Sequence, residues 1–210
     1  MSRQTKAAIA VFAVVLFIFI AWLDKSSQKQ FPSSATDSVS NHTSSRRDCE
    51  KYDGKTFTVI NIVDGDTIDI NIFDAQHNHT RIRLLGVDTP ETRTKESQPM
   101  YFGPQASAFA KEILLSKEVT IFLDAKGKTR DKYNRLLAYI QLPDEHFFNE
   151  LLIEEGYAYA DLRFKHPFYD KYKSLESIAR KQKRGLWENV TLEQMPPWLQ
   201  KRKLEKSLSK

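Results

Sequence analysis

Two apolar segments joined by a short turn constrain the fold of this chain more than any other feature. The first lies within residues 57–63 and the second within residues 68–72, and Asp64-Gly65-Asp66 separates them. In the second segment isoleucines alternate with polar residues, as in a strand with one buried face. Two such strands around a short turn that contains glycine predict a β-hairpin.

Three further segments have the composition of strands, and three longer ones have helical periodicity. Together with the hairpin, the additional strands predict a small β-barrel. Pro104 begins the first helical segment, in which apolar residues recur at helical spacing. The expected strands cover residues 81–87, 119–123 and 135–142, and the expected helices cover residues 104–114, 147–155 and 168–183. The prediction is one α+β unit with a five-stranded barrel and three helices.

An apolar run at the N-terminus predicts one transmembrane or signal helix before this unit, within residues 1–25. Residues 7–23 are apolar throughout and follow the basic residues Arg3 and Lys6. As a helix the run would be roughly 25 Å long, close to the roughly 30 Å of a bilayer core. It ends in Ile-Ala-Trp-Leu rather than in small residues, which favours an uncleaved anchor over a cleaved signal peptide.

The basic residues before the run predict the orientation of the anchor. Positive charge favours a cytoplasmic N-terminus, so the rest of the chain is expected to be periplasmic or extracellular. If the segment is cleaved, the protein is expected to be secreted. The membrane is therefore one expected partner of the chain, and no obligate protein partner is predicted.

Composition divides the remainder into a linker, a domain and a tail. Residues 26–50 are rich in polar residues and predict a flexible linker, residues 51–190 hold the barrel domain, and residues 191–210 form a basic tail. Cys49 is the one cysteine, which excludes an internal disulfide and a cysteine-based zinc cluster.

The basic tail carries most of the formal net charge of +5. Overall basicity therefore does not indicate a nucleic-acid partner for the domain, and that case depends on particular residues. The tail is either a basic amphipathic helix that contacts lipid or nucleic acid or a frayed, solvated segment. In the helical alternative one side would carry Trp198, Leu199, Leu204 and Leu208.

Carboxylates at two expected turns are candidates for a metal site. Asp66 lies in the hairpin turn, and Asp88 and Glu91 belong to the segment Asp88-Thr89-Pro90-Glu91. Hard cations such as calcium take about six to eight oxygen ligands, so two carboxylates and a carbonyl form a plausible partial shell. A helical calcium-binding loop is excluded because the segment lacks its central glycine and terminal glutamate. The alternative is that these residues only stabilise turns.

Two arginines are candidates for binding an anion. Arg83 lies within an apolar strand, so it requires either a buried carboxylate or an anionic ligand. Arg135 stands where the last expected strand begins. A regular strand would place Arg83 and Asp88 on opposite faces, and Gly86 is the expected position of a bulge that brings them together.

Four motifs occur in order along the chain: Asp64-Gly65-Asp66-Thr67, the segment 83–91, the segment 103–109, and Asp131-Lys132-Tyr133-Asn134-Arg135. In this order and at these separations they resemble the staphylococcal nuclease (thermonuclease) family over roughly residues 55–187. The resemblance implies an OB-type five-stranded barrel with three helices, in agreement with the periodicity. It also implies a calcium-dependent nuclease that hydrolyses phosphodiester bonds of DNA and RNA.

The resemblance implies roles for individual residues. Asp66 and Asp88 match calcium-binding carboxylates, and Thr89 matches a residue whose backbone carbonyl faces the metal. Glu91 matches the general base that orients or deprotonates the attacking water.

The remaining matched residues are expected to bind substrate. Arg83 and Arg135 match the arginines that hold the scissile phosphate, where guanidinium groups stabilise the charge of the transition state. Lys132 and Tyr133 match residues near the terminal phosphate of the nucleotide. The implied substrates are single-stranded or locally open DNA and RNA, and the implied products carry a 3′ phosphate and a 5′ hydroxyl.

One departure from the family pattern lies after the second expected helix. The aromatic pair that packs against the base and sugar in the family falls on Leu162 and Phe164. Tyr157, Tyr159 and Phe168 are either an alternative stacking surface or core residues.

The sequence thus predicts an active nuclease outside the cytoplasmic membrane. A non-catalytic OB-fold module that binds nucleic acid is the alternative, because this fold often binds without cleaving. Retention of both arginines, both aspartates and the glutamate favours the enzyme.

Overall fold

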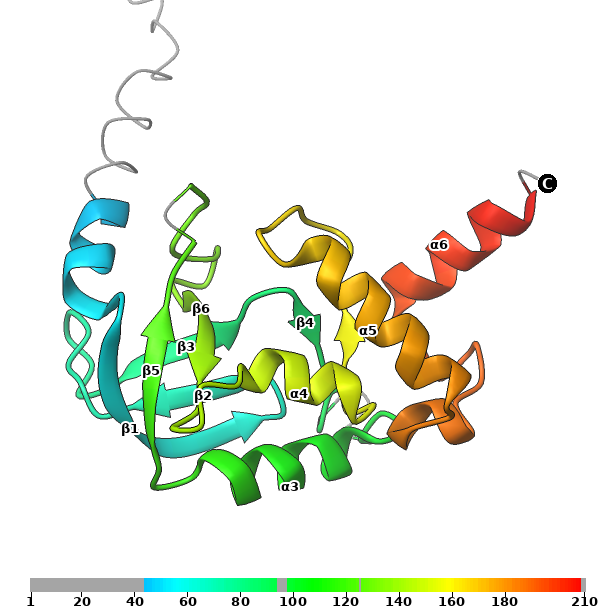
Figure 1. Ribbon diagram of the computed structural model, residues 1–210, viewed down its shortest axis with the longest axis horizontal. Helices are drawn as coiled ribbons and strands as arrows, with labels where there is room; N and C mark the ends of the chain where they lie inside the picture. Colours follow the sequence, from blue (N-terminus) through cyan, green and yellow to red (C-terminus); the bar gives the residue numbers. More distant parts are fainter. Residues whose placement is uncertain (1–43, 94–97, 125, 209–210) are drawn as a thin grey trace, which may run out of the picture. The chain divides into compact units, whose positions relative to one another are not determined.

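A closed five-stranded β-barrel forms the body of the protein (Figure 1). The computed structural model describes residues 44–93, 98–124 and 126–208. The strands follow the order β1-β2-β3-β6-β5 around the barrel, and all neighbours are antiparallel except β3 and β6, which are parallel. Their bounds are β1 Lys55–Asp64, β2 Thr67–Ile70, β3 Thr80–Leu84, β5 Glu118–Phe122 and β6 Leu136–Gln141. The predicted hairpin and the predicted five-stranded barrel are confirmed.

Strand β1 is long enough to pair with both of its neighbours in the barrel. Lys55 to Thr58 pair with β5, while Val59 to Asp64 pair with β2 and contain two shifts of register. Irregularities of this kind bend a strand and increase its twist, which allows a small sheet to close. Apolar side chains from all five strands fill the interior, among them Val59, Ile68, Ile82, Ile121 and Ile140.

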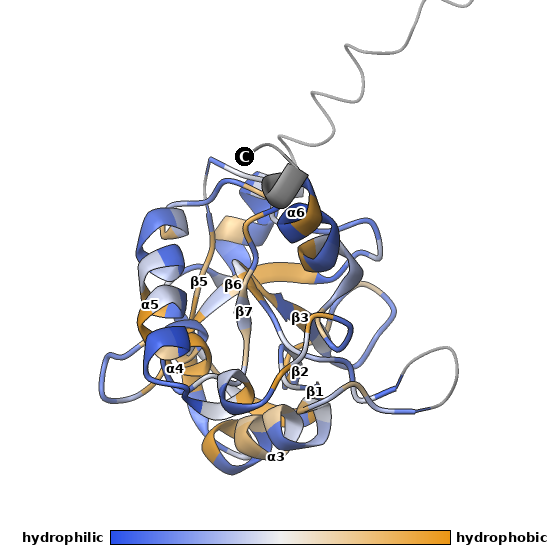
Figure 2. Cartoon of the chain, turned by 90° about the vertical axis from the view of Figure 1, so that its right-hand side faces the viewer, coloured by the Kyte–Doolittle hydropathy of each residue, from blue (hydrophilic) through white to orange (hydrophobic). Residues whose placement is uncertain are grey.

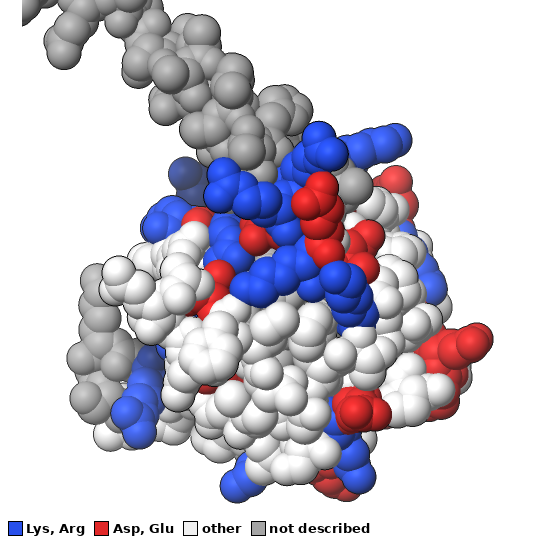
Figure 3. Space-filling model, turned by 90° about the vertical axis from the view of Figure 1, so that its left-hand side faces the viewer, with Lys and Arg blue, Asp and Glu red and all other residues white. Residues whose placement is uncertain are grey.

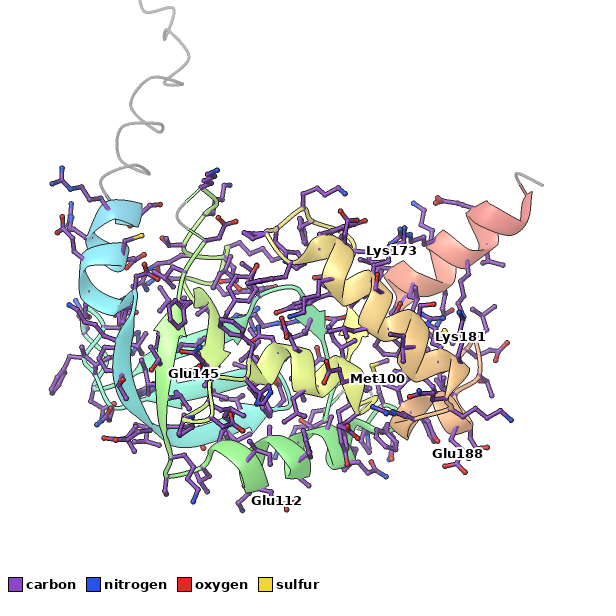
Figure 4. The ribbon with its side chains drawn as sticks, viewed as in Figure 1. Met100, Glu112, Glu145, Lys173, Lys181 and Glu188 are labelled. Atoms are coloured by element: carbon purple, nitrogen blue, oxygen red, sulfur yellow. The ribbon has the colours of Figure 1, made fainter. Side chains whose placement is uncertain are left out.

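Three helices cover the barrel, as the sequence predicts: α3 (Gly103–Leu114), α4 (Phe148–Glu154) and α5 (Tyr169–Lys181). Each turns an apolar side inward, for example through Ala106, Ala110 and Leu114 of α3. The opposite sides carry charged residues, and Glu112 of α3 and Lys181 of α5 point away from the barrel into solvent (Figure 4).

A second small sheet and a satellite core lie beside the barrel. Strand β4 (Val87–Asp88) pairs with β7 (Tyr159–Ala160) in antiparallel orientation. The 3-10 helix η1 (Gly185–Glu188) and helix α6 (Pro197–Leu208) follow α5. The satellite core contains Tyr159, Ala179, Leu186, Trp187, Met195 and Leu199. In Figure 2, which looks from the side of α6, the apolar colour concentrates on the strands and on the inner sides of the helices.

Within the basic tail, the first turn of helix α6 packs against the satellite core and is not a solvated segment. Leu199 is buried in the satellite core, whereas Leu204 is 54% exposed. The side chain of Leu208, on the same predicted side, lies outside the described residues.

A further helix, residues 44–52, precedes the barrel and is fastened to it. Asp48 accepts hydrogen bonds from Arg130 at 2.9 Å and 2.7 Å, and the buried Tyr52 hydroxyl lies 3.0 Å from the Thr80 hydroxyl. Residues 44–50 of the predicted linker, residues 26–50, thus belong to a helix, and composition does not reveal the pairing of Asp48 with Arg130. Residues 26–43 lie outside the described part of the chain.

Charge on the side of helix 44–52 is mixed. Figure 3 shows Lys and Arg side chains gathered over the upper part of this face, with Asp and Glu side chains among them. The charge distribution alone therefore does not indicate a nucleic-acid-binding surface on this side of the domain.

Within the residues that the structure describes, no helix is both long and apolar enough to cross a membrane. The apolar run 7–23, on which the predicted anchor or signal depends, lies outside these residues.

Candidate active site

The turn between β1 and β2 holds Asp66 in a fixed orientation. The backbone N–H of Asp66 donates to Asp64 Oδ1 at 3.1 Å, and the hydroxyl of Thr67 donates to Asp66 Oδ1 at 3.1 Å. Asp66 Oδ2 accepts the backbone N–H of Thr89 at 2.7 Å. Gly65 makes this approach possible, since a Cβ there would lie 2.8 Å from Thr89 Cγ2. The predicted metal residues Asp66 and Thr89 are therefore neighbours.

Arg83 of β3 joins Asp66 to Asp88. Its Nη1 lies 3.0 Å from Asp66 Oδ2, and its Nη2 donates to Asp88 Oδ1 at 2.7 Å. The same guanidinium donates to the carbonyls of Leu84 and Val87. Gly86, with φ of +79°, lies in the turn between β3 and β4, and the carbonyls of Leu84 and Val87 on either side of this turn accept from the guanidinium. The irregularity predicted at Gly86 is therefore a turn with positive φ rather than a bulge within a strand.

Their surroundings raise the pKa values of Asp66, Asp88 and Arg83. Burial raises the pKa of Asp66 to about 6, although Arg83 opposes the shift. Burial also raises the pKa of Asp88, again against the effect of Arg83. Burial lowers the pKa of Arg83, but the neighbouring carboxylates outweigh it and raise that pKa overall. Burial is thus the main cause of both raised carboxyl pKa values, because it disfavours the charged form, and a cation beside the two carboxyl groups would favour that form.

Glu91 lies at the rim of this cluster and is exposed to solvent. Enough protein surrounds its carboxyl group that burial, followed by the charges of Asp66 and Asp88, raises its pKa. Its backbone carbonyl accepts the N–H of Met100 at 2.9 Å, and Gly103 at the start of α3 approaches the same carbonyl so closely that a Cβ would lie 2.4 Å away. Met100 is labelled in Figure 4. The start of α3 therefore fixes the backbone of Glu91.

Asp131 organises the turn that carries Lys132, Tyr133 and Arg135. Its Oδ1 accepts the backbone N–H groups of Tyr133 at 2.9 Å and Arg135 at 3.0 Å, and its Oδ2 accepts Arg135 Nε at 2.7 Å. Lys132 Nζ and the Arg135 guanidinium lie 4.9 Å and 5.4 Å from the centre of the Tyr133 ring. The charge of Arg135 also reaches Glu91 and opposes the rise of its pKa, without cancelling it. Arg135 thus lies near the cluster but is paired with Asp131.

Two side chains that the sequence analysis did not assign to the site complete the surroundings of Asp88. Arg163 Nη2 donates to Asp88 Oδ1 at 3.2 Å and is itself held by Asp161. The indole N–H of Trp198 donates to Asp88 Oδ2 at 2.8 Å. No motif pointed to these residues, because β7 and α6 bring them to Asp88 from distant parts of the chain.

The positions that match the base-packing aromatics differ in burial. Leu162 packs against the barrel core, whereas Phe164 is 65% exposed. Tyr157 stacks on Phe109 with centroids 4.1 Å apart, and Tyr159 is fully buried. Phe168 packs edge-on against Tyr139 at 4.8 Å. Tyr157, Tyr159 and Phe168 are therefore core residues, so Phe164 is the exposed aromatic at the matched positions.

The donor set around Arg83 fits a hard cation only in part. Among the described residues, no three histidine, cysteine, aspartate or glutamate side chains converge to hold a metal ion. The site offers the oxygens of Asp66 and Asp88, whose pKa values burial raises against the opposing effect of Arg83. Oxygen donors of this kind suit calcium or magnesium, with the remaining positions left to carbonyl, water and substrate oxygens.

The chain is similar to one protein family and to several nucleases. A model of the family described as staphylococcal nuclease homologue matches residues 81–189. The thermonuclease of Staphylococcus intermedius is 39% identical over 139 residues, which cover 64% of this chain and 77% of that protein. The thermonuclease of Staphylococcus hyicus is 36% identical over 136 residues, with the same coverage. The SPbeta prophage-derived endonuclease of Bacillus subtilis is 35% identical over 132 residues, which cover 62% of this chain and 43% of that protein.

Proposed function

Because the chain belongs to the staphylococcal nuclease family, and is therefore a phosphodiester-hydrolysing nuclease with a nucleic-acid substrate, we propose that it is calcium-dependent and cleaves both DNA and RNA. The cluster of Arg83, Asp66 and Asp88 beside Glu91 is the proposed catalytic centre. One observation carries this proposal: the Arg83 guanidinium lies 3.0 Å and 2.7 Å from the carboxylates of Asp66 and Asp88, whose pKa values burial keeps raised. A cation beside these carboxylates would offset their charge, and together with Arg83 it would favour an anionic ligand.

The cation site in this proposal uses Asp66 and Asp88, together with the backbone carbonyl of Thr89. Bound calcium would offset negative charge on a phosphate oxygen. The protein already fixes both carboxylates, since Asp66 accepts the Thr89 N–H and Asp88 accepts N–H groups from Arg83, Arg163 and Trp198. Little reorganisation is therefore needed on binding.

Arg83 and Arg135 are the proposed phosphate-binding groups. Among the described residues, the four contacts of Arg83 use its terminal nitrogens, which leaves its Nε–H for a phosphate oxygen. Arg135 is half-buried, and Asp131 holds its side chain beside Tyr133. Two guanidinium groups stabilise the charge that develops on a pentacoordinate phosphate, and loss of one such donor typically slows a reaction by about 10²–10³.

Glu91 is the proposed base. Its raised pKa makes the carboxylate a stronger base, and its exposure leaves room for a water molecule. In the proposed step, the water oxygen forms a bond to phosphorus while Glu91 takes one of its protons. The bond from phosphorus to the 5′ oxygen breaks, and this oxygen gains a proton from solvent. The products are a 3′ phosphate and a 5′ hydroxyl.

The exposed turn at Lys132 and Tyr133 is the proposed contact for the nucleotide. Tyr133 is 68% exposed, so a base or sugar can pack against its ring, and Lys132 supplies charge for a phosphate beside it. Phe164, also exposed, would take the place of the aromatic pair of the family. Single-stranded or locally open nucleic acid suits such contacts, because stacked duplex bases are not available to aromatic side chains.

We also propose that the nuclease domain lies outside the cytoplasmic membrane, attached by the apolar run 7–23 or released after cleavage of it. The test is fractionation of expressing cells, followed by protease treatment of intact cells or spheroplasts. Degradation of the domain only after external protease is added supports display beyond the membrane. Recovery of an intact, protease-resistant domain in the cytoplasm would contradict it.

Cleavage of end-labelled single-stranded DNA and RNA by the full chain tests the enzymatic proposal. Reactions contain calcium or a calcium chelator, and the fragment ends are identified with a kinase that labels only 5′ hydroxyl groups. Calcium-dependent fragments that accept the label are expected. Tight binding without fragments would instead indicate the non-catalytic OB-fold binding module.

A further inference from the structure

The C-terminal segment reaches the candidate metal site through one hydrogen bond. Trp198, in the first turn of α6, donates its indole N–H to Asp88 Oδ2 at 2.8 Å. The other oxygen of the same carboxylate accepts Arg83 at 2.7 Å and Arg163 at 3.2 Å. Donors therefore hold both oxygens of Asp88, and the Asp88 side chain is only 15% exposed. The plane of the carboxylate is fixed, and Trp198 is the donor at Oδ2.

The indole is itself held firmly. Its neighbours Met195 and Leu199 are buried in the satellite core. The guanidinium of Arg163 lies over the indole at 4.9 Å, and Asp161 fixes that guanidinium with two hydrogen bonds of 2.8 Å. A donor anchored in this way can hold a carboxylate in one orientation.

This contact lies outside the part of the chain that the family model matches, which ends at residue 189. Trp198 is 110 residues from Asp88 in the sequence, so the tail contributes to the site only in the folded protein. Groups that hydrogen-bond a metal-binding carboxylate orient it, and their loss typically weakens metal affinity or activity by about 10- to 100-fold.

We propose that Trp198 is a positioning residue of the nuclease, whose indole N–H holds the Asp88 carboxylate in the orientation that binds the cation. The inference depends on the proposed function, because it assumes that Asp88 is a cation ligand. It makes the segment from η1 to α6 a part of the active site rather than an appendage. One lone pair of Oδ2 accepts the indole N–H, and the other remains for the cation.

A matched pair of variants tests the proposal. Trp198→Phe removes the indole N–H, whereas Trp187→Phe makes the same chemical change in the same satellite core. Within the described part of the chain, the buried Trp187 Nε1 has no hydrogen-bond partner, so this control loses no bond to a carboxylate. Calcium binding to the full chain is measured by calorimetry, and cleavage is measured as a function of calcium concentration.

The expected result is a Kd for calcium that rises about 10- to 100-fold in Trp198→Phe and stays near the wild-type value in Trp187→Phe. At saturating calcium, Trp198→Phe should recover most of its kcat, because the residue acts through Asp88. Equal calcium affinity in both variants and the wild type would overturn the inference while leaving the nuclease intact. A wild-type chain that neither binds calcium nor cleaves would overturn the proposed function as well.

A measurement on the wild-type chain covers the case in which Trp198→Phe does not fold. The chain contains three tryptophans, so their indole N–H signals can be followed by NMR after labelling with ¹⁵N-tryptophan. The signal of Trp198 should shift on addition of calcium, and the signal of Trp187 should not. A Trp198 signal that does not respond to saturating calcium would contradict the proposal.

Discussion

Replacement of Arg83 by alanine tests how much of the stability of the folded protein depends on the pairing of this guanidinium with Asp66 and Asp88. The side chain is 14% exposed and lies within 3.0 Å of both Asp66 and Asp88. Removal of one partner from a buried ion pair typically costs about 3–5 kcal/mol, because the other charge stays buried without compensation. For a domain of this size each kcal/mol lowers Tm by about 2–4 °C, so we expect a loss of roughly 6–20 °C without calcium.

The loss of Tm in Arg83→Ala should become smaller as the pH falls and when calcium is added. Without Arg83, the folded-state pKa of each carboxyl group lies still further above its unfolded value. The destabilisation is then complete at high pH and disappears as the pH falls through the folded-state pKa values, where both groups take up protons. Calcium should restore more stability to Arg83→Ala than to the wild type, since it supplies the missing charge. Thermal unfolding followed by circular dichroism, with and without calcium, measures each effect.

Arg81→Ala provides the matched control for Arg83→Ala. Arg81 is on the same strand and the same face, but it is 45% exposed and pairs with Asp69 instead. It should retain cleavage, whereas Arg83→Ala should lose about 10²–10³ in rate. If Arg83→Ala without calcium is as stable as the wild type at neutral pH, the reasoning about the shared partner is refuted.

Three further predictions concern the cation, the nucleotide contact and the turn at Gly86. Calcium should raise Tm at neutral pH, and the gain should fade below pH of about 6, where Asp66 takes up a proton that competes with the cation; a gain that is independent of pH would contradict this. Tyr133→Ala should raise KM for an oligonucleotide by about 5- to 150-fold and change kcat little, since base stacking contributes about 1–3 kcal/mol; steady-state kinetics would show the reverse if the ring served the chemical step. Gly86→Ala should lower the free energy of unfolding by about 1–3 kcal/mol, because its Cβ would lie 2.5 Å from the His166 ring. Denaturant unfolding should show a smaller loss in Gly54→Ala, where no atom lies within 4 Å, and equal losses would refute the steric argument.

Most of the barrel could be predicted from sequence because its strands carry a local signal. Alternation in residues 68–72 and the glycine turn before it specify the hairpin, and β1 to β3 form as expected. The pairing of β4 with β7 could not be predicted, since strands of two residues have no measurable period. Helix 44–52 was also missed, because its attachment to the barrel depends on the pairing of Asp48 with Arg130 rather than on an apolar stripe.

The candidate site was predictable where its residues lie in short motifs and not where it depends on tertiary contacts. Asp66, Arg83 and Asp88 meet as expected, since the hairpin turn and the turn at Gly86 bring them together. Arg163 and Trp198 gave no local signal, because each reaches Asp88 only once β7 and α6 have packed.

The central claim, that the cluster around Arg83 hydrolyses phosphodiester bonds with Glu91 as base, is tested most directly by the cleavage rate of Glu91→Gln. The assay follows a single-stranded oligonucleotide at saturating calcium, with the wild type and Glu112→Gln as references, since Glu112 lies on the solvent side of α3 (Figure 4). A positioned base typically contributes about 10²–10⁴ in rate, so Glu91→Gln should be slower by that factor while Glu112→Gln matches the wild type. Cleavage by Glu91→Gln at the wild-type rate would contradict the account.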